Sequence, residues 1–588
     1  VDEKDYDSIE PLPNLDFQIM QGNSLIEEFY GITLDINKKT VQGEIFEDTN
    51  KIDELINSLH QAQTMFSNES NYKRKKEFKN KVENCIIDIF KFKYNEKKNI
   101  SDIDSLKMSK DIESIIHAKN PRNFFPWKLY FAEIFREKGG FDIIIANPPY
   151  IGEKGNKKTF APIKASLLGE RFYQGKMDIF YFFFHVAIDL LKKNGITAFI
   201  STNYFITATF AKNLRNDLKN RTSFLKLINF GEFKIFNSAE GQHNMITILK
   251  KGNDSGGQVW AAKVNGKGHL KNNHEIIRNI LTGYDENTEY YTQLNKTIYY
   301  EHDNYIGFWP TEYSNIFEKM IVNSERLDEV TDVNTGIMGG CDYITKNNIR
   351  GYNHKLGEGV FVLDKNHDTE VPNIDLKPFF KNSDIDRYHT SSDNEKYIIY
   401  SSPQNYSDLD PITKDHIDKY RDVLTKIREI NNESKNSYKY LRRGTSNQMI
   451  FESEKIVVPQ RSRVNTFGYN EIPWYASADV YFISQPKMNY KLKYILGILN
   501  SKLIYNWLYY RGKRKGSALE LYQKPLSQIP IPKASDEDQG EIIKIIDKIL
   551  ATKKNDPASD TSEYEAIIDK LVCKLYNLEE KEILIVCA

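Results

Sequence analysis

A chain of 588 residues is too long for one hydrophobic core, and about 150 residues per domain predicts three or four compact units. Its formal net charge of zero excludes a uniformly basic nucleic-acid coat but leaves room for local basic patches. The four cysteines show no CxxC spacing and no paired histidine cluster, which speaks against a structural zinc site. We expect a reduced, cytoplasmic protein that holds no metal.

A membrane partner is not expected. The longest apolar stretch, residues 179–188, is about half the length that a membrane-spanning helix requires. No signal peptide is visible, and the chain begins with Val1 instead of methionine. We therefore expect a chain that is truncated at its N-terminus.

The N-terminal part of the chain contains segments of different composition and periodicity. Residues 15–25, LDFQIMQGNSL, predict a strand and a turn, and residues 33–120 are charged with helical periodicity. Two apolar stripes mark that region, Ile52, Leu55, Ile56 and Leu59, then Phe78, Val82, Cys85, Ile86 and Ile89. The pattern predicts a helical insertion between two strands of one sheet.

The segment 141–251 alternates strands with helices. Residues 143–146, Ile-Ile-Ile-Ala, are short, apolar and rich in β-branched side chains, which predicts an interior strand of a parallel sheet. The elements expected after it are a helix over 175–195, a strand over 195–202, a helix over 208–219 and a strand over 224–230. This order predicts a doubly wound α/β domain, with residues 1–252 forming one catalytic domain.

The remaining chain divides into three parts by composition. Residues 253–330 are polar and aromatic, and the sequence leaves the fold of this connecting region open. Residues 331–535 mix short strands with short helices, which predicts an α+β domain. Residues 536–588 predict a tail of amphipathic helices with Ile542, Ile545, Ile546 and Ile549 on one face.

The tetrad Asn147-Pro148-Pro149-Tyr150 follows the strand at 143–146. Prolines end a strand, so a proline kink that caps the strand is the simplest interpretation. A chemical one is that Asn147 and the Pro148 carbonyl accept the two N–H groups of an exocyclic amine, while Pro149 braces that carbonyl. Tyr150 then stacks on a base that has been flipped out of its duplex. Such a site lies where ligands bind open α/β sheets.

Residues 127–151 and 175–205 resemble the catalytic region of adenine-specific (N6) DNA methyltransferases of type IIG restriction-modification and phage-defence systems, in the TaqI-like branch. The similarity continues through 231–250, where it implies that Phe236 stacks on the other face of the base. At IMQGNSL it implies that Asn23 and Ser24 border the cofactor. LGILNSKLIYNWLYY and LSQIPIPK look like the end of a target-recognition domain.

The resemblance implies a Rossmann-like class I methyltransferase sheet followed by a DNA target-recognition domain over 331–535. It implies S-adenosylmethionine as cofactor, double-stranded DNA as partner and methyl transfer to the N6 atom of a flipped adenine at a specific sequence. A restriction or phage-defence system would be the setting.

The family's Gly-rich cofactor loop is not matched upstream of the IMQGNSL turn. The nearest glycine cluster, GIMGGCD at 336–342, looks like the loop that opens the recognition domain. We therefore expect a sheet that is incomplete at its N-terminus and a chain that is inactive alone. Three explanations compete: an expression fragment, a split enzyme completed by a methyltransferase or nuclease portion or another defence subunit, and a natural remnant.

Other functions stay open beside the main one. The chain could be a DNA-specificity subunit that binds its target without methylating it, an N4-cytosine methyltransferase, or an RNA or protein methyltransferase using the same tetrad. A 5-methylcytosine mechanism is set aside because no cysteine follows a proline, and nothing in the sequence supports a nuclease.

Eight basic residues are candidates for holding DNA, although a solvated basic loop is the alternative for the run at 509–516. The candidates are Arg442, Arg443, Arg461, Arg463, Arg511, Lys513, Arg514 and Lys515. Each contact with a phosphate would steepen the salt dependence by about one unit. The sequence does not tell which of them read bases.

Overall fold

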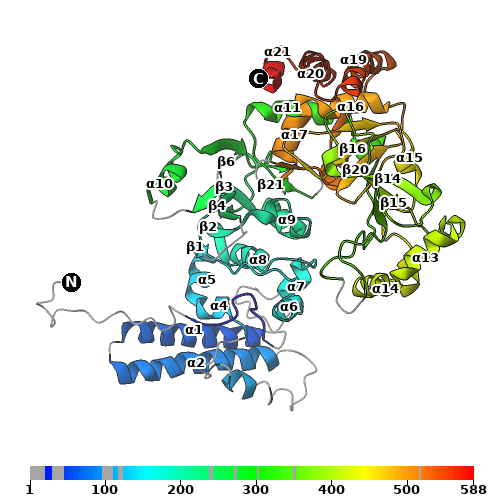
Figure 1. Ribbon diagram of the computed structural model, residues 1–588. Coiled ribbons are helices and arrows are strands. Elements are labelled where there is room, and N and C mark those ends of the chain that lie inside the picture. The colour runs from blue at the N-terminus through cyan, green and yellow to red at the C-terminus, as the bar shows by residue number, and fades with distance from the viewer. Residues whose placement is uncertain are drawn as a thin grey trace, which may run out of the picture. The chain divides into compact units, whose positions relative to one another are not determined.

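The computed structural model describes residues 20–29, 46–69, 71–95, 107, 110–114, 116, 123–236, 243–265, 267–269, 274–300, 303–348, 353–515 and 518–587. The chain forms two compact units, Val1–Phe308 and Trp309–Ala588, called here the N-terminal and the C-terminal unit (Figure 1). Within the described residues no helix is long and apolar enough to cross a membrane.

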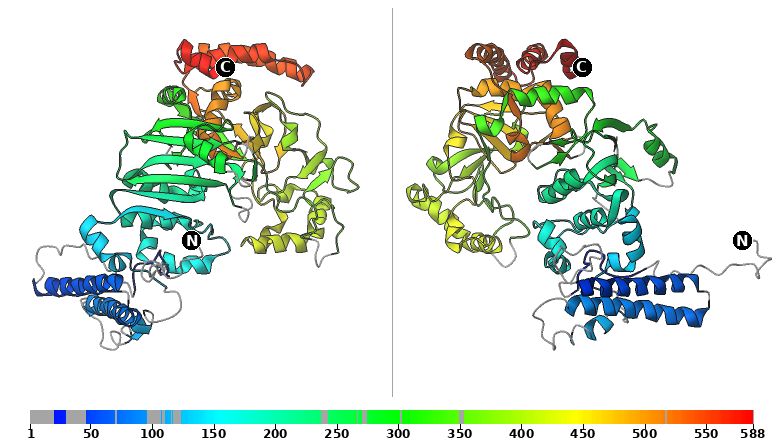
Figure 2. Two further views of the ribbon diagram at one scale, coloured as in Figure 1. Left: turned by 90° about the vertical axis from the view of Figure 1, so that its left-hand side faces the viewer. Right: turned by 180° about the vertical axis from the view of Figure 1, so that it is seen from behind.

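The N-terminal unit is built on one mixed sheet, which the left view of Figure 2 shows nearly face on. Its order is β1(Phe141–Ala146), β2(Leu191–Thr202), β5(Asn244–Lys251), β3(Thr222–Asn229), β6(Gln258–Val264) and β8(Thr288–Leu294). β1 is parallel to β2 and β3 is parallel to β6, whereas β5 runs antiparallel to both of its neighbours. Residues whose fold the sequence left open thus add β6 and β8 to the same sheet.

Among the described residues strand β1 lies at the edge of this sheet, so they do not confirm the prediction of an interior strand. Its only strand partner among the described residues is β2. The side chains of Ile143 and Ile145 are 59% and 78% exposed, which is unusual for a β-branched run. Such a run indicates a strand that is suited to burial on both faces, but it does not specify which strands lie beside it.

Helices cover the sheet as the alternation of the sequence predicts. α8(Phe180–Leu190) packs on β2 and α9(Lys212–Arg221) packs on β3. The predicted helix over 175–195 is shorter in the structure, because β2 already begins at Leu191 and its first residue pairs with Phe141. Shorter helices of this unit are α4(Trp127–Tyr130), α5(Ala132–Lys138), α6(Lys157–Lys164), α7(Leu167–Phe172) and α10(His274–Thr282).

A buried ionic network ties α8 to α9. His185 Nδ1 lies 2.6 Å from Asp217 Oδ2, and Arg221 donates to both oxygens of Asp217. Burial opposes ionisation of Asp217, yet the hydrogen bonds from His185 and Arg221 lower the pKa of this carboxyl to about 2. The His185 ring also stacks on Phe172, with centroids 3.6 Å apart. These contacts hold together α8 and α9, the two helices that pack on β2 and β3.

Two long helices, α1(Phe46–Asn68) and α2(Tyr72–Asn95), form a hairpin in this unit. Their predicted stripes are confirmed, since Ile56, Leu59, Val82 and Ile86 are buried in one apolar cluster. Residues 20–25 form no regular strand but do turn at Ser24 and Leu25, and residues 15–19 of that prediction lie outside the described residues. Short strand pairs are β4(Glu232–Lys234) with β7(Lys267–His269), and β9(Tyr299–Tyr300) with β10(Tyr305–Ile306).

The C-terminal unit mixes short strands and helices, as the sequence predicts for 331–535. One four-stranded sheet contains β12(Asp332–Thr335), β20(Val480–Ser484), β16(Lys455–Pro459) and β18(Gly468–Asn470). A second contains β13(Val362–Asp364), β15(Lys396–Ile399), β14(Leu376–Phe380) and β19(Tyr475–Ala476). Smaller sheets join β17(Arg461–Ser462), β22(Ala518–Glu520) and β21(Lys513–Lys515), and β11(Ser324–Arg326) with β23(Pro530–Pro532).

Helices surround these sheets and close the chain. They are α11(Glu312–Val322), α12(Leu327–Val330), α13(Pro411–Lys419), α14(Arg421–Ile430), α15(Met449–Glu452), α16(Leu492–Asn500), α17(Lys502–Arg511) and α18(Gln523–Ser527). The tail follows as α19(Asp536–Asn555), α20(Ser562–Leu575) and α21(Glu580–Cys587), which cluster at the red end of the chain in Figure 2. Ile542, Ile546 and Ile549 are buried, so the predicted apolar face of the tail is confirmed.

Candidate functional site

The tetrad at 147–150 leaves the carboxyl end of β1, as predicted. Asn147 is exposed, Pro148 is buried and Tyr150 is half-buried. The Tyr150 hydroxyl donates to Asn147 Oδ1 at 3.0 Å, and the Ile200 carbonyl oxygen is a second acceptor at 3.3 Å. Burial raises the pKa of the Tyr150 phenol, so its hydroxyl is a protonated donor at neutral pH.

The two predicted acceptors differ in their present partners. Asn147 Oδ1 already accepts a hydrogen bond from Tyr150. The Pro148 carbonyl oxygen accepts none from the residues that the structure describes. One acceptor is therefore open to an incoming amine and the other is held by a side chain that can rotate away.

The chain after the tetrad is fixed by a short pairing with the segment before α8. Ile179 N–H donates to the Ile151 carbonyl at 2.9 Å, and Glu153 N–H donates to the Met177 carbonyl at 2.9 Å. Gly152 sits between these bonds, and a Cβ there would lie 3.2 Å from Asp178 Oδ1. The backbone that carries Tyr150 is thus anchored on both sides.

Three further asparagines lie at the same edge of the sheet, and the sequence analysis missed them. Asn203 follows β2, Asn229 ends β3 and Asn244 begins the antiparallel β5, where it pairs with Thr202. Asn203 Nδ2 donates to Asn229 Oδ1 at 2.9 Å, and Gly231 N–H donates to the same oxygen at 3.0 Å. Asn229 ends an apolar run and Asn244 begins one, but neither is followed by prolines like those that mark Asn147 in the sequence.

The amide of Asn244 is an exception among these groups. The residue is 1% exposed, and its Nδ2 donates no hydrogen bond within the described part of the chain. It lies close enough to the Tyr150 hydroxyl to lower the pKa of that phenol by hydrogen bonding, against the larger effect of burial, although the contact is not a well-formed hydrogen bond. A poorly paired buried donor beside a candidate base-binding ring is costly unless a ligand satisfies it.

Phe236 lies beyond the turn that Asn229 and Gly231 fix. It follows β4 and is half-buried, and its ring stacks on no other ring of the described residues. His243 Nδ1 lies 2.6 Å from the Gly231 carbonyl oxygen, which adds a second anchor to the same turn.

The predicted cofactor residues serve the fold in this structure. Asn23 Oδ1 accepts from its neighbour Leu25 N–H at 3.2 Å, and the Ser24 carbonyl accepts from Trp127 Nε1 at 3.0 Å. No hydrogen bond joins this turn to residues 147–150 within the described chain. The residues present form one turn and not a complete cradle for a nucleoside cofactor.

The eight basic candidates separate into three groups. Arg443 and Arg463 are exposed, and neither side chain has a partner among the described residues. Arg442, Arg461 and Lys513 are held by carboxylates, Arg442 by Glu433 and the other two by Glu520. Arg514 lies over the Tyr509 ring, 3.8 Å from its centroid, and the side chain of Lys515 lies outside the described residues.

Arg511 does not lie where a phosphate clamp would need it. It is 8% exposed, and its guanidinium lies 4.1 Å from the Trp507 ring centroid and 5.7 Å from that of Trp309. Arginine in this position packs helix α17 through cation–π contacts. Periodicity alone did not reveal that Arg511 points inward. All the basic residues of 509–516 therefore looked like candidates for holding DNA.

No cluster of three or more histidine, cysteine, aspartate or glutamate side chains with metal-binding geometry occurs within the described residues. The chemistry of the tetrad needs none, because amide and carbonyl oxygens are its acceptors.

Comparison with known proteins gives two family matches. Residues 28–236 match the Eco57I restriction-modification methylase, and residues 377–531 match the TaqI-like C-terminal specificity domain. The first match contains the tetrad and Phe236 but not Asn23 and Ser24.

Individual relatives agree with these matches. The type II methyltransferase M.HindII of Haemophilus influenzae is 24% identical over 443 residues, 71% of this chain and 81% of that protein. The adenine-specific methyltransferase BrxX of Escherichia coli is 30% identical over 120 residues, 20% of this chain and 9% of that protein. The type IIL restriction-modification enzyme MmeI, solved with DNA, shares the fold at a TM-score of 0.51 and 14% identity over 91% of this chain and 76% of that one. The chain therefore contains an Eco57I-like restriction-modification methylase domain followed by a TaqI-like C-terminal specificity domain.

Proposed function

We propose that this protein transfers a methyl group from S-adenosylmethionine to the N6 atom of an adenine flipped out of a specific double-stranded DNA sequence. The observation that carries the proposal is the pair of acceptors at the end of β1, Asn147 Oδ1 and the Pro148 carbonyl, beside the Tyr150 ring. The relative BrxX is an adenine-specific methyltransferase, which supports adenine as the target base.

The two acceptors act on the geometry of the amine. The exocyclic nitrogen of adenine is a poor nucleophile because its lone pair is delocalised into the ring. When Asn147 and Pro148 each accept one N–H, the nitrogen is drawn toward a tetrahedral shape and its lone pair points out of the base plane. Asn147 thus both orients the amine and raises its reactivity.

Tyr150 must change partner for this to happen, because its hydroxyl donates to the oxygen that the amine needs. A base entering the site replaces a phenol donor by an amine donor at Asn147 Oδ1, so the acceptor stays paired before and after binding. The freed phenol ring offers one face to the base and Phe236 offers the other. Flipping costs a few kcal/mol, and stacking on the two rings offsets it.

The methyl donor's side of the site is incomplete in the described residues, which supply only the Asn23–Ser24 turn. S-adenosylmethionine would supply the methyl group as an electrophile when bound. We propose that the sheet continues beyond β1 with a further parallel strand that carries the remaining cofactor contacts. The outer edge of β1, whose backbone pairs with no strand among the described residues, supports that proposal.

This arrangement also gives the domain organisation that we propose. The catalytic sheet, with the helices of 33–120 as an insertion, extends through β8 and therefore beyond residue 252. The specificity domain occupies 331–535, and the tail 536–588 closes it. A DNA-specificity subunit that binds its target without methylating it is the second candidate, favoured by the same open edge of β1.

Tritiated methyl incorporation into duplex DNA tests the proposal, using the whole natural protein together with any subunit that accompanies it. We expect incorporation as N6-methyldeoxyadenosine, identified by chromatography of the digested nucleosides. Asn147→Ala should lower the rate at least about a hundredfold, the usual effect of removing one group that stabilises a transition state. Asn80→Ala, an exposed asparagine on α2, is the matched control. Equal rates for the wild type and Asn147→Ala would refute the role of Asn147, and N4-methyldeoxycytidine as product would refute adenine.

A further inference from the structure

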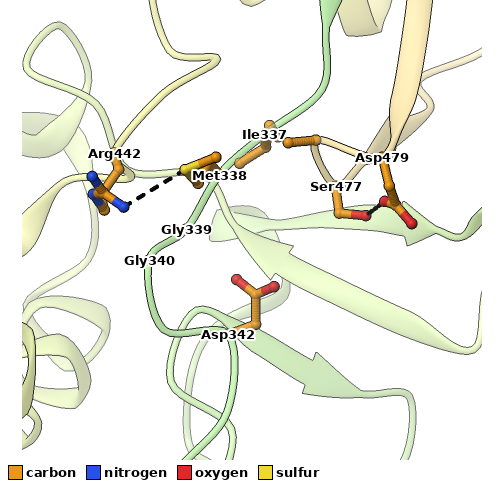
Figure 3. A pocket seen from close by; sticks show the side chains of 9 residues that line it. Ile337, Met338, Gly339, Gly340, Asp342, Arg442, Ser477 and Asp479 are labelled. Carbon is orange, nitrogen blue, oxygen red and sulfur yellow. Dashed lines mark hydrogen bonds between the residues drawn. The ribbon is translucent and has the colours of Figure 1, made fainter. Parts of the chain in front are cut away.

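A pocket of about 390 Å³ opens in the C-terminal unit, on the loop that follows β12. Its walls are the residues 337–340 and Asp342 of the GIMGGCD segment, Arg442, and residues 477–479 (Figure 3). It therefore brings together three stretches that are far apart in the sequence, one of them with a predicted DNA-binding arginine. Arg442 and residues 477–479 lie within the match to the specificity domain, and residues 337–342 precede that match.

Asp342 faces this pocket without a partner. Its carboxylate accepts no hydrogen bond from the described residues, although its backbone carbonyl accepts from Val360 and Val362. Burial raises the pKa of this carboxyl, and repulsion from Asp479 adds to the shift. Asp479 itself is satisfied, because Ser477 Oγ donates to it and Asn382 Nδ2 donates at 2.6 Å. Asp342 is thus the acceptor that the fold leaves for a ligand.

Arg442 supplies a donor to the same pocket. Arg442 donates to the Glu433 carboxylate through Nε at 3.1 Å and Nη2 at 2.6 Å. These hydrogen bonds are the main reason why the pKa of Glu433 is lowered to about 2. The remaining nitrogen, Nη1, has only the Met338 sulfur at 3.6 Å, a weak acceptor (Figure 3). The carboxylate therefore fixes the guanidinium plane while Nη1 remains available for a better acceptor.

Two glycines separate the donor from the acceptor. A Cβ on Gly339 would lie 2.3 Å from Asp342 Oδ1, and a Cβ on Gly340 would lie 2.6 Å from Arg442 Cδ. Gly340 also has a φ of +92°, which other residues rarely adopt. The bare backbone between the two side chains keeps the pocket open and holds Asp342 and Arg442 on opposite sides of it.

We propose that this pocket reads one G·C base pair of the DNA target, with Arg442 Nη1 donating to guanine O6 or N7 and Asp342 accepting from cytosine N4. These are the hydrogen-bond types by which arginine and aspartate distinguish those bases in the major groove. Adenine presents its donor and its acceptor on one base and matches the single amide of asparagine or glutamine. A donor and an acceptor on opposite sides of the pocket match the two members of a G·C pair.

Arg443 has a different place and a different role. Its side chain is exposed beside the pocket and has no partner in the described chain, whereas its backbone pairs with Met338. It is not among the pocket-lining residues. A free surface guanidinium of this kind contacts phosphate and carries no sequence information. Arg442 thus reads a base, whereas the neighbouring Arg443 positions the protein on the DNA backbone.

The inference rests on the proposed DNA recognition and can be tested without methyl transfer. The full chain selects duplexes from a library with a randomised stretch, at fixed salt, and the bound pool is sequenced. We expect one G·C position whose preference falls about 5- to 150-fold in both Asp342→Ala and Arg442→Ala, while preferences at other positions persist. Arg443→Ala, the matched control, should weaken binding evenly over all sequences and lower the salt slope by about one unit.

Each outcome decides between distinct ideas. Asp342→Asn, nearly the same shape, keeps the test valid if an alanine variant fails to fold, and it should also weaken the preference for cytosine. Unchanged preferences in the Asp342 and Arg442 variants of a sequence-selective protein would overturn the pocket's role alone. Relaxation at an A·T position would overturn the G·C assignment. A wild-type protein that selects no sequence would overturn the proposed DNA recognition and this inference with it.

Discussion

The two candidate sites of this protein hold their key acceptors in opposite states. At the end of β1, Asn147 Oδ1 is occupied by the Tyr150 hydroxyl at 3.0 Å. In the pocket of the C-terminal unit, the Asp342 carboxylate is half-buried and accepts no hydrogen bond from the described residues. The first site is closed by its own tyrosine and the second is open.

This difference matches the two tasks. A base that is flipped into the methylation site has to displace an internal partner, which disfavours binding of anything that cannot replace that hydrogen bond. A base pair in the groove is read where it stands, so the pocket needs no rearrangement but bears the cost of an unpaired carboxylate before DNA arrives. The methylation site thus gains selectivity because a base must replace the hydrogen bond of Tyr150 to Asn147. The pocket gains it because the Asp342 carboxylate lacks a hydrogen-bond donor until the DNA supplies one.

The largest expected effect concerns the closed site, where Tyr150 has two separable parts. Tyr150→Ala removes the ring and should lower kcat/KM for DNA about 5- to 150-fold, from ~1–3 kcal/mol of lost base stacking. Tyr150→Phe keeps the ring and frees Asn147 Oδ1, so its kcat/KM should stay within about threefold of the wild type. Steady-state methylation of a fixed duplex measures both.

The pair of variants distinguishes the two roles of Tyr150. If Tyr150→Phe loses as much activity as Tyr150→Ala, the hydroxyl takes part in the reaction and is not merely a placeholder on Asn147. Fluorescence of 2-aminopurine at the target position then tells whether flipping itself is impaired.

The sequence predicted the tetrad's place at the end of β1 because apolar strands and prolines leave strong local signals. It placed β1 in the interior of the sheet, since β-branched residues suit a strand covered on both sides whether or not a neighbour is present. Asn203, Asn229 and Asn244 escaped notice because their meeting at one edge depends on β5 inserting between β2 and β3. In the C-terminal unit the basic residues were visible, but their carboxylate partners, such as Glu433 for Arg442, were not, because those contacts depend on the fold.

Asn244 gives the next largest effect. Its buried Nδ2 makes no well-formed hydrogen bond in the described chain and only a weak contact with the Tyr150 hydroxyl, so Asn244→Ala should leave the free energy of unfolding within about 1 kcal/mol of the wild type. If a bound base satisfies this donor, the same variant should raise KM for DNA about 5- to 15-fold with little change in kcat. Urea unfolding and steady-state kinetics provide the two numbers. A change in kcat without a change in KM would instead assign Asn244 to positioning Tyr150.

A smaller effect tests how much stability the unpaired Asp342 carboxylate costs the C-terminal unit. Asp342→Asn removes an unpaired carboxylate that Asp479 repels, so the C-terminal unit should become more stable to urea by up to about 1 kcal/mol. Asp479→Ala should have the opposite sign and cost about 1–2 kcal/mol, because Ser477 and Asn382 lose their common acceptor. Destabilisation by Asp342→Asn would mean that the carboxylate supports the fold, and the contrast between the two sites would disappear.

The smallest effect is a pH dependence at the same pocket. Burial and then Asp479 raise the pKa of Asp342 above its usual range, against an opposing attraction to Lys396. Only the ionised carboxylate accepts fully from cytosine N4, so lowering the pH through this raised pKa should weaken the preference for the G·C pair. Protonation favours the folded protein at the same time, since a raised pKa in the folded state makes unfolding costlier as the pH falls toward the ordinary value. Binding preference and stability should therefore move in opposite directions with pH, and both slopes should flatten in Asp342→Asn. Competition between a G·C and an A·T duplex, measured from pH 7.5 downward beside urea unfolding, would refute this coupling if the preference were independent of pH in the wild type.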